Sequence, residues 1–393
     1  MTPSAFAAML YDSYPEYRLD HLNPGDCQHQ PVHKELLDLV SRSGGLFALE
    51  EVGKSVEGRT LSMVKLGTGP RRVMLWSQMH GDEPTATLAL LDILNGILVA
   101  REEEWVRAML RELSLFMVPL VNPDGAELRQ RRSVTGIDIN RDAEAMRTPE
   151  AQALHHARSR LRPEFGFNLH DQELSSVGES PYPSAMALLA PPASSDRKTT
   201  NTRLRAIRVC ALISRILEPY ARGRITRYDD TYEPRAFGDT FQASGTSTIL
   251  IESGHWPKDP QKAFVRELNV IGILTALRSI GNGSHEDTEF DYYHRLPSNG
   301  KRMVDLLIRG VHVQHPSGWE RVVDVGVMFQ KSHDVVMIKD IGDLHTFGGL
   351  ETIVLADRTI ATEKLPVDGL LRTQDLFDAL QTYHPIPPLA FRP

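Results

Sequence analysis

The feature that most constrains the fold is an alternation of short apolar runs with helix-length segments between residues 32 and 280. The apolar runs have the length of strands, and Thr148-Pro149 is a helix start signal between two of them. Strands that alternate with helices are typical of proteins in which helices cover a mostly parallel sheet. We therefore expect an α/β fold, with a mixed, mostly parallel twisted sheet flanked by helices.

The individual elements can be placed from these runs. We expect strands at 71–78, 113–121, 165–170 and 247–253. We expect helices at 85–99, 148–161, 199–217 and 260–279.

Changes in amino-acid composition along the chain also predict its domains. Residues 1–31 are rich in Pro, Tyr, Asp and His and are expected to be an irregular lead-in, before a larger α/β domain at 32–280. Gly, polar and acidic residues at 281–291 predict a linker. Residues 292–393 contain β-rich runs separated by Gly, Pro and Asp, so we expect a small β-rich domain whose role the sequence does not indicate.

Composition excludes several classes of function. The 393 residues include 44 Lys and Arg and 51 Asp and Glu, a net charge of -7, which argues against nucleic acid or an anionic membrane as a partner. Two cysteines exclude a disulfide scaffold and a Cys-rich zinc site. The chain shows neither a signal-peptide pattern nor an apolar run long enough for a membrane span, so we expect a cytoplasmic protein.

The sharpest local motif is His80-Gly81-Asp82-Glu83, which follows the strand expected at 71–78. A His and a Glu three residues apart in a turn can direct two ligand atoms at one metal ion. Such a pair also occurs by chance, in which case the His is a satisfied core residue and the Glu is solvated. The motif therefore needs support from the rest of the chain.

Three further motifs follow strands or surround turns. Asn122-Pro123-Asp124-Gly125 is also an ordinary turn sequence. Gly136-Ile137-Asp138-Ile139-Asn140-Arg141-Asp142 contains an amide next to a guanidinium, which suits a carboxylate ligand but also an exposed salt bridge. Phe167-Asn168-Leu169-His170 places a His at a strand end, where open α/β sheets bind ligands.

In this combination and order the motifs resemble the zinc carboxypeptidase family, the M14-type metallopeptidases, and within it a bacterial, cytoplasmic type of member. Residues 53–67 look like the family's opening hairpin, and HGDE, NPDG, GIDINRD, NLHD and TILIESG follow in the family's order. The resemblance covers roughly residues 45–280.

The resemblance implies a metal site. One zinc ion per chain would be held by His80, Glu83 and His170. Glu252, in ILIESG, would be the general base that activates the zinc-bound water. The alternative for Glu252 is a salt bridge at the end of the sheet, although Glu is seldom buried without a partner.

The resemblance also implies substrate-binding residues. Asn140 and Arg141 would hold the terminal carboxylate of a substrate. An upstream arginine would stabilise the oxyanion, and spacing to Gly136 favours Arg131 narrowly over Arg132.

Two positions leave room for other interpretations. Arg129 competes with Arg131 and Arg132 for the oxyanion role. Arg235, in a charged segment at 229–239, could bind an acidic group of the substrate, but a salt bridge with Glu233 or Asp239 is an equal alternative.

The resemblance therefore predicts a zinc metallocarboxypeptidase that removes the C-terminal residue of a peptide. The residue after Arg141 is Asp142, where peptide-cleaving members commonly have Asn. The substrate could thus also be a small amide with a free carboxylate, such as an N-acyl amino acid or a γ-glutamyl murein peptide. A non-catalytic carboxylate-binding protein is a third hypothesis, but the ligands and the base are all present.

Overall fold

The apolar runs of the N-terminal three quarters of the chain form one eight-stranded sheet, in the order β1-β2-β4-β3-β5-β9-β7-β8. Its strands are β1 (Phe47–Lys54), β2 (Thr60–Leu66), β3 (Arg71–Ser77), β4 (Leu113–Val118), β5 (Phe165–Asp171), β7 (Met186–Leu189), β8 (Ile225–Arg227) and β9 (Ser247–Ser253). The central strands β4, β3, β5 and β9 are parallel. The pairs β1–β2, β2–β4 and β7–β9 are antiparallel, so the sheet is mixed as predicted.

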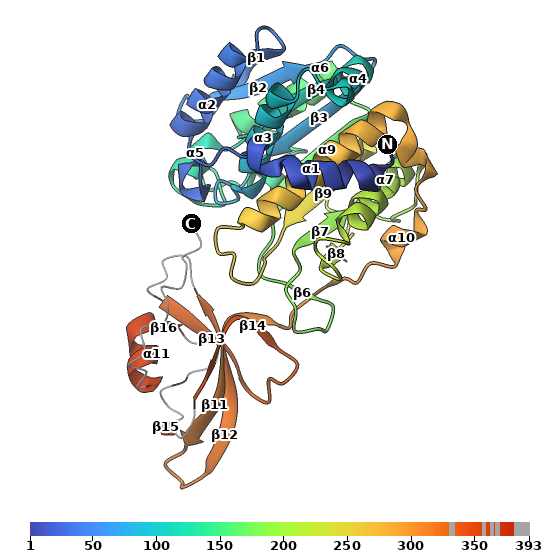
Figure 1. Ribbon diagram of the computed structural model, residues 1–393. Helices are drawn as coiled ribbons and strands as arrows, with labels where there is room; N and C mark the ends of the chain where they lie inside the picture. The colour runs from blue at the N-terminus through green and yellow to red at the C-terminus, as the bar shows by residue number, and fades with distance from the viewer. Residues whose placement is uncertain (330–334, 356–358, 362–364, 366–369, 381–393) are drawn as a thin grey trace. The chain divides into compact units, whose positions relative to one another are not determined.

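The structure, a computed structural model, describes residues 1–329, 335–355, 359–361, 365 and 370–380 (Figure 1). Contacts divide the chain into two compact units. The first contains residues 1–172, 186–253 and 264–296, and the second contains 173–185, 254–263 and 297–393. The linker expected at 281–291 lies near the end of the first unit.

Helices of the first unit connect and cover the strands. They are α1 (Pro3–Tyr17), α2 (His29–Arg42), α3 (Thr85–Val99), α4 (Glu104–Glu112), α5 (Pro123–Glu127), α6 (Pro149–Leu161), α7 (Asn201–Leu217), α8 (Phe237–Ala243), α9 (Ala263–Asn282) and α10 (Asp291–His294), with short 3-10 turns η1 (Pro24–Asp26), η2 (Ile139–Arg141) and η3 (Ser284–Asp287). The helices predicted around α3, α6, α7 and α9 are present. Thr148 caps α6 as expected, because its side chain accepts a hydrogen bond from the Ala151 N–H.

Burial on both faces explains why β3 is apolar throughout. Met74 and Trp76 belong to a core cluster that includes residues of α6 and α8. Val73 and Leu75 point to the opposite face, and both are also fully buried. A strand covered on both faces has no polar side, which is why the run was readable as a central parallel strand.

The irregular lead-in expected at residues 1–31 is wrong for most of its length, because α1 and η1 lie there. Helix α1 buries Phe6, Leu10 and Tyr14, which are spaced by four residues and form one face. The Tyr14 hydroxyl donates to Asp92 of α3 at 2.9 Å. The abundance of Pro and Tyr concealed this helical periodicity, since Pro3 stands at the helix start, where proline is tolerated.

The second unit is β-rich, as predicted for the C-terminal region. Its sheet has the order β14-β11-β12-β13-β16, and β15 pairs with β11. The strands are β11 (Met303–Gln314), β12 (Glu320–Phe329), β13 (Val335–Gly342), β14 (Gly348–Val354), β15 (Thr359–Ala361) and β16 (Leu370–Arg372), and helix α11 (Thr373–Leu380) follows.

A two-stranded sheet ties an earlier part of the chain into this second unit. Strand β6 (Ser176–Val177) pairs with β10 (Asn299–Gly300). The Ser176 hydroxyl accepts a hydrogen bond from the Arg302 N–H at 3.0 Å, and the Arg302 side chain contacts Glu179 at 2.8 Å. The segment that follows β5 is therefore held by residues that come after position 297.

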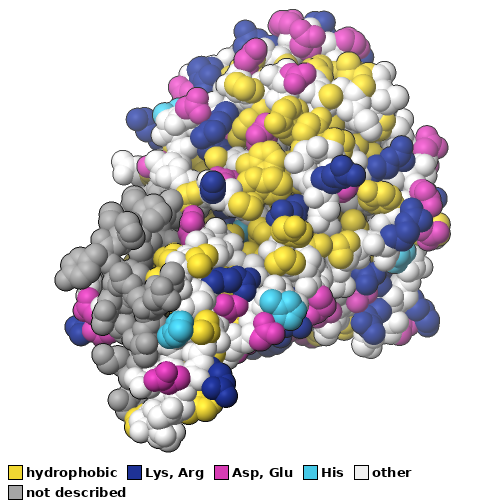
Figure 2. Space-filling view, turned by 60° about the horizontal axis from the view of Figure 1, so that its bottom comes forward, with side chains coloured by type: hydrophobic (Ala, Val, Ile, Leu, Met, Phe, Trp, Pro, Cys, Tyr) yellow, Lys and Arg dark blue, Asp and Glu magenta, His cyan; other side chains and the backbone are white. Residues whose placement is uncertain are grey.

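Among the described residues, no helix combines the length and the hydropathy needed to cross a bilayer. Figure 2 shows basic and acidic side chains interspersed on one face, with hydrophobic side chains between them. A cytoplasmic location stays a prediction.

Candidate metal centre

The first part of the site is the turn between β3 and α3. Gln78 follows the strand with a φ of 50°, and the Glu83 N–H donates to the His80 carbonyl at 3.1 Å, which closes the turn. The Gln78 side chain is buried and donates to the carbonyls of Cys27 and Gly81. These contacts hold His80 and Glu83 on one side of a short, braced loop.

The turn packs directly against α5, which the Asn122-Pro123-Asp124-Gly125 motif begins. A Cβ atom at Gly81 would overlap the Gly125 backbone, so this close approach requires glycine. Asn122 caps α5, because its side chain accepts from the Gly125 N–H at 2.9 Å. The motif is therefore the packing surface of the turn that carries His80.

Two adjacent strands bring the other side chains to the same edge of the sheet. His170 lies near the end of β5, and Glu252 lies near the end of β9. The two residues are register partners across the parallel pair. Since β3, β5 and β9 run parallel, their carboxyl ends meet where the His80 turn begins.

His80, Glu83 and His170 form a buried cluster whose ligand atoms all lie within 4.8 Å of one another. Glu83 bridges the two histidines: one carboxylate oxygen lies 2.7 Å from His80 Nδ1 and the other 2.9 Å from His170 Nδ1. Two imidazoles and one carboxylate are the donor set of a catalytic zinc site that leaves a position open. The donor chemistry and the convergence of both Nδ1 atoms on Glu83 thus fit a zinc ion.

Burial and charge shift the pKa values of Glu83 and Glu252 in opposite directions. Burial opposes ionisation of Glu83, but contacts with His80 and His170 outweigh it and hold the pKa of its carboxyl well below the ordinary range. For Glu252, burial and the nearby negative charge of Glu83 raise the pKa of the carboxyl well above its ordinary value. Carboxyl groups with pKa values driven apart are typical of acid–base sites.

The pKa values of His80 and His170 are also shifted in opposite directions. Burial disfavours a charge on both rings. At His80 the carboxylates of Glu83 and Asp138 together outweigh burial and raise the pKa of the imidazole to about 9. At His170 burial dominates and lowers the pKa of the ring.

Arg131 and Asp138 complete the surroundings of His80. An Arg131 guanidinium nitrogen lies 3.1 Å from Glu83 Oε1, and Arg131 Nε donates to Asp138 Oδ2 at 3.2 Å. Asp138 Oδ1 lies 3.1 Å from His80 Nε2. A carboxylate on the second nitrogen of a metal-binding imidazole fixes the orientation of the ring.

The other two arginines that were open for the oxyanion role point elsewhere. Arg132 donates to the Gly136 carbonyl, and Arg129 donates to the Gly25 carbonyl. Of the three, the contacts of Arg131 alone, among those described, reach the metal-ligand cluster.

Asn140 and Arg141 lie at the edge of the His80, Glu83 and His170 cluster. Asn140 is buried, its amide nitrogen lies 3.3 Å from His170 Nε2, and its Oδ1 accepts from the Phe237 N–H. Arg141 is partly exposed and lies 3.4 Å from Glu233. Asn140 therefore lies at the cluster, while Arg141 extends toward solvent.

Arg235 has a carboxylate partner within its own loop. Its guanidinium makes a two-pronged contact with Glu233, at 2.9 and 2.7 Å. This is the salt bridge that was the alternative for this residue. Glu233 is thus shared by Arg141 and Arg235.

Three acidic residues support the site, and the sequence did not indicate these structural roles. Asp138 lies inside a quoted motif but received no role. Asp124 accepts hydrogen bonds from the Ser55 hydroxyl and from Arg59, so it joins the 53–67 hairpin to α5. Asp142 accepts from Thr148 and from the Arg147 N–H and so braces the start of α6. Each is an acidic residue within a motif, which is the one signal that could have identified it.

The Asp171 backbone also contributes to the site. Its N–H donates to Glu83 Oε2 at 3.2 Å, and its side chain accepts from the Thr85 hydroxyl at 2.6 Å. The end of β5 and the start of α3 are joined through these contacts, with Glu83 between them.

Part of the chain is similar in sequence to known carboxypeptidases. The family model described as zinc carboxypeptidase matches residues 32–181. Carboxypeptidase SOL1 of Arabidopsis thaliana is 28% identical over 128 residues, which cover 31% of this chain and 26% of that protein. Carboxypeptidase E of Caenorhabditis elegans is 33% identical over 134 residues, which cover 28% of each chain. The chain thus spans about a quarter of the length of these curated relatives.

Solved structures show the same fold. A metallo-carboxypeptidase from Burkholderia cenocepacia aligns with a TM-score of 0.51 and 18% identity, over 66% of this chain and 69% of that one. Thrombin activatable fibrinolysis inhibitor aligns with a TM-score of 0.53 and 13% identity, over 66% of this chain and 75% of that one. Residues 32–181 thus match a zinc carboxypeptidase domain, and the sheet around them has the fold of metallo-carboxypeptidases.

Proposed function

We propose that this protein is a zinc-dependent metallocarboxypeptidase, which hydrolyses the amide bond of the C-terminal residue of a peptide. The observation that carries the proposal is the buried cluster of His80, Glu83 and His170, with ligand atoms within 4.8 Å of one another. His80, Glu83 and His170 would hold one zinc ion. When bound, the ion would lower the pKa of water and polarise the scissile carbonyl.

The roles of the surrounding side chains follow from their positions. Glu252, beside His170 in the sheet, would take a proton from the attacking water and return it to the leaving nitrogen. Arg131 would donate hydrogen bonds to the negative oxygen that develops on the carbonyl. Glu252 is positioned by β9, and Arg131 is held by its contacts with Asp138 and Glu83.

Polar side chains at the edge of the metal-ligand cluster would select the substrate. Asn140 and Arg141 would bind the terminal carboxylate, and Arg132 would extend the positive charge around them. Arg235 is tied to Glu233, and Arg141 contacts the same carboxylate. An incoming substrate carboxylate would therefore compete with Glu233 for Arg141.

The test is metal analysis combined with a substrate panel. We expect about one zinc per purified chain and release of C-terminal amino acids from peptides with a free, but not an amidated, C-terminus. A chelator should abolish the release, and added zinc should restore it. Hydrolysis confined to N-acyl amino acids or γ-glutamyl peptides would establish the small-amide alternative. A chain that binds no divalent metal would refute the site.

A further inference from the structure

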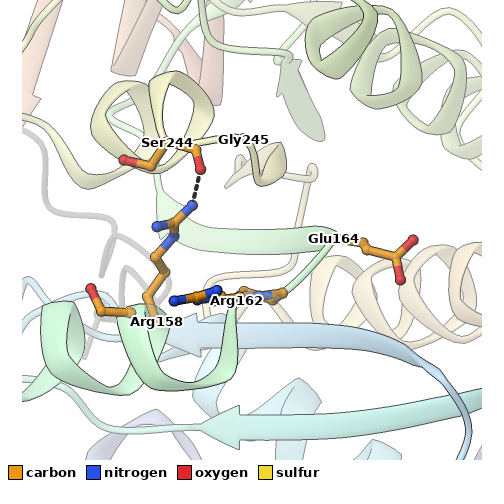
Figure 3. A pocket seen from close by; sticks show the side chains of 7 residues that line it. Arg158, Arg162, Glu164, Ser244 and Gly245 are labelled. Atoms are coloured by element: carbon orange, nitrogen blue, oxygen red, sulfur yellow. Dashed lines mark hydrogen bonds between the residues drawn. The ribbon is translucent and has the colours of Figure 1, made fainter.

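A second cluster of charged groups lies at the opposite end of the same sheet. Arg158 and Arg162 come from the C-terminal turn of α6, and the Ser244–Gly245 turn precedes β9. Together with Glu164 they line a surface cavity of about 460 Å³ (Figure 3). Strands β5 and β9 run from this end toward His170 and Glu252, so roughly 20 Å of strand separates the cavity from the metal centre.

Arg158 is fixed in position before any ligand arrives. Its Nε donates to the Thr246 hydroxyl at 3.3 Å, and one terminal nitrogen donates to the Ser244 carbonyl (Figure 3). Its guanidinium also lies over the Phe241 ring, at 5.8 Å from the centroid. These contacts occupy Nε and Nη2, and Nη1 remains for a further acceptor.

The positive charge of the cavity is not compensated by a carboxylate. Among the described residues, neither Arg158 nor Arg162 forms an ion pair. Glu164 lines the cavity, but its carboxylate points away from both guanidiniums (Figure 3). Burial lowers the pKa of the Arg158 guanidinium, and the neighbouring positive charge of Arg162 lowers it further.

The neighbouring Arg160 shows the contrast. It lies on the same helix and forms an ion pair with Glu50, which also contacts Lys65. The C-terminus of a helix favours cations, but only weakly in exposed settings. That effect accounts for basic residues in the last turn, but it does not account for anchoring one of them beside a second, unpaired arginine.

We propose that the cavity at Arg158 and Arg162 binds a phosphate-type oxyanion, either free phosphate or the phosphoryl group of a small metabolite. A phosphate carries close to two negative charges at neutral pH and offers several acceptor oxygens, which matches two guanidiniums. The cavity volume lies within the range of small-molecule sites. Because the site is remote from His170, the anion and a peptide substrate can bind together.

The experiment is a titration of the metal-loaded, full-length protein with inorganic phosphate by calorimetry, with sodium chloride at equal ionic strength as a control. Arg162→Gln removes an exposed guanidinium with no described structural contact of its side chain. Arg160→Gln is the matched control, since it removes an arginine of the same helix that is already paired. We expect saturable binding that Arg162→Gln weakens at least about fivefold and Arg160→Gln leaves nearly unchanged.

Two further ligands identify the class and source of the anion. Tighter binding of glycerol 2-phosphate than of phosphate would indicate a phosphorylated metabolite, and weaker binding would indicate free phosphate. Succinate that binds as tightly as phosphate would overturn the assignment to a phosphate-type ligand. The absence of saturable binding, binding unaffected by Arg162→Gln, or equal losses in both arginine variants would overturn the site itself. None of these results depends on peptide hydrolysis.

Discussion

At the scale of single residues, Glu83 and Glu252 are two buried carboxylates with different surroundings. Glu83 contacts both histidines and Arg131, so each of its oxygens has a cationic or N–H partner. Glu252 lies beside His170 in the sheet, and burial raises the pKa of its carboxyl. Glu83 is therefore suited to stay ionised as a ligand, and Glu252 to exchange a proton.

This difference predicts the phenotype of Glu252→Gln. The amide keeps the size of the side chain but cannot take a proton, so we expect kcat to fall about 10²- to 10⁴-fold. Zinc content and KM should change little, because the ligands and the substrate rim are untouched. Steady-state kinetics with metal analysis of the same sample would measure this, and an unchanged kcat would refute the role of Glu252.

A second residue-scale prediction concerns pH and Glu267 in α9. Burial raises the pKa of its carboxyl from 4.5 to about 7, although the positive charge of Arg18 opposes the shift. A raised folded-state pKa means that its favourable contribution is full below pH 4.5 and is lost as pH rises through 7. We expect Glu267→Gln to raise the unfolding free energy by about 1 kcal/mol at pH 8, after allowance for solvent screening, and by almost nothing at pH 4.

Urea unfolding at the two pH values would measure the effect. Glu16→Gln on α1 is the control for loss of an exposed acidic charge. Equal changes for the two variants, or no dependence on pH for Glu267→Gln, would contradict the assignment.

At the scale of elements, the metal centre depends on two turns that touch. The His80 turn and the start of α5 approach so closely that no Cβ fits at Gly81. Asp124 then connects α5 to the hairpin of β1 and β2. The HGDE motif, the NPDG motif and the 53–67 hairpin are far apart in the sequence, but they pack against one another in the fold.

Substitution of Gly81 by Ala should therefore displace the turn. We expect a loss of about 1–3 kcal/mol in unfolding free energy and a clear loss of zinc affinity, because both ligands of the turn would shift. Gly272→Ala, inside helix α9, is the control and should leave stability unchanged or raise it, since the added methyl meets only side-chain atoms of Ile213 and Leu217. Thermal unfolding and zinc titration would compare them, and normal metal affinity in Gly81→Ala would contradict this account.

The elements also show what the sequence could and could not predict. Strands β3, β5 and β9 were predictable because strands covered on both faces are apolar throughout. Residues at their ends, such as His80 and His170, could then be placed at one edge. Helix α1 was missed because its composition resembled a loop.

The contact partners of charged side chains were harder to predict than the positions of the strands. Arg235 and Arg131 are both arginines in charged segments, and only the folded chain shows that one contacts Glu233 and the other contacts Glu83. Arg131 and Glu83 are far apart in the sequence, so no local pattern indicates their contact. Arg235 has two acidic residues nearby, Glu233 and Asp239, and the sequence does not show which one it contacts. Its place within a motif could have drawn attention to Asp138, but its contacts with His80 and Arg131 are visible only in the folded chain.

At the scale of the molecule, the two units are interleaved along the chain. The segments 173–185 and 254–263 follow the strands that carry His170 and Glu252, yet they belong to the second unit. Gly300 has no room for a side chain, because a Cβ there would overlap the Gly178 carbonyl and the Ser176 side chain. The pairing of β6 with β10 therefore depends on this glycine.

Gly300→Val should break that pairing while keeping the full chain. We expect new protease cleavage within 173–185, since the segment would lose its partner strand and the contact with Arg302. Ser298→Ala is the control, because Ser298 accepts the Gly178 N–H through its backbone carbonyl. Limited proteolysis with mass spectrometry would locate the cuts, and identical digestion of the two variants would contradict the prediction.

The interleaving has a consequence for how the protein is made. Strand β6 ends at Val177 and its partner β10 begins at Asn299, so about 120 residues must be translated before they can pair. At roughly 5–20 residues per second, the segment after His170 leaves the ribosome on the order of ten seconds before its partner. During that interval strand β6 of the nascent chain has no partner strand. We therefore expect the rate of translation across residues 178–298 to affect the yield of native protein.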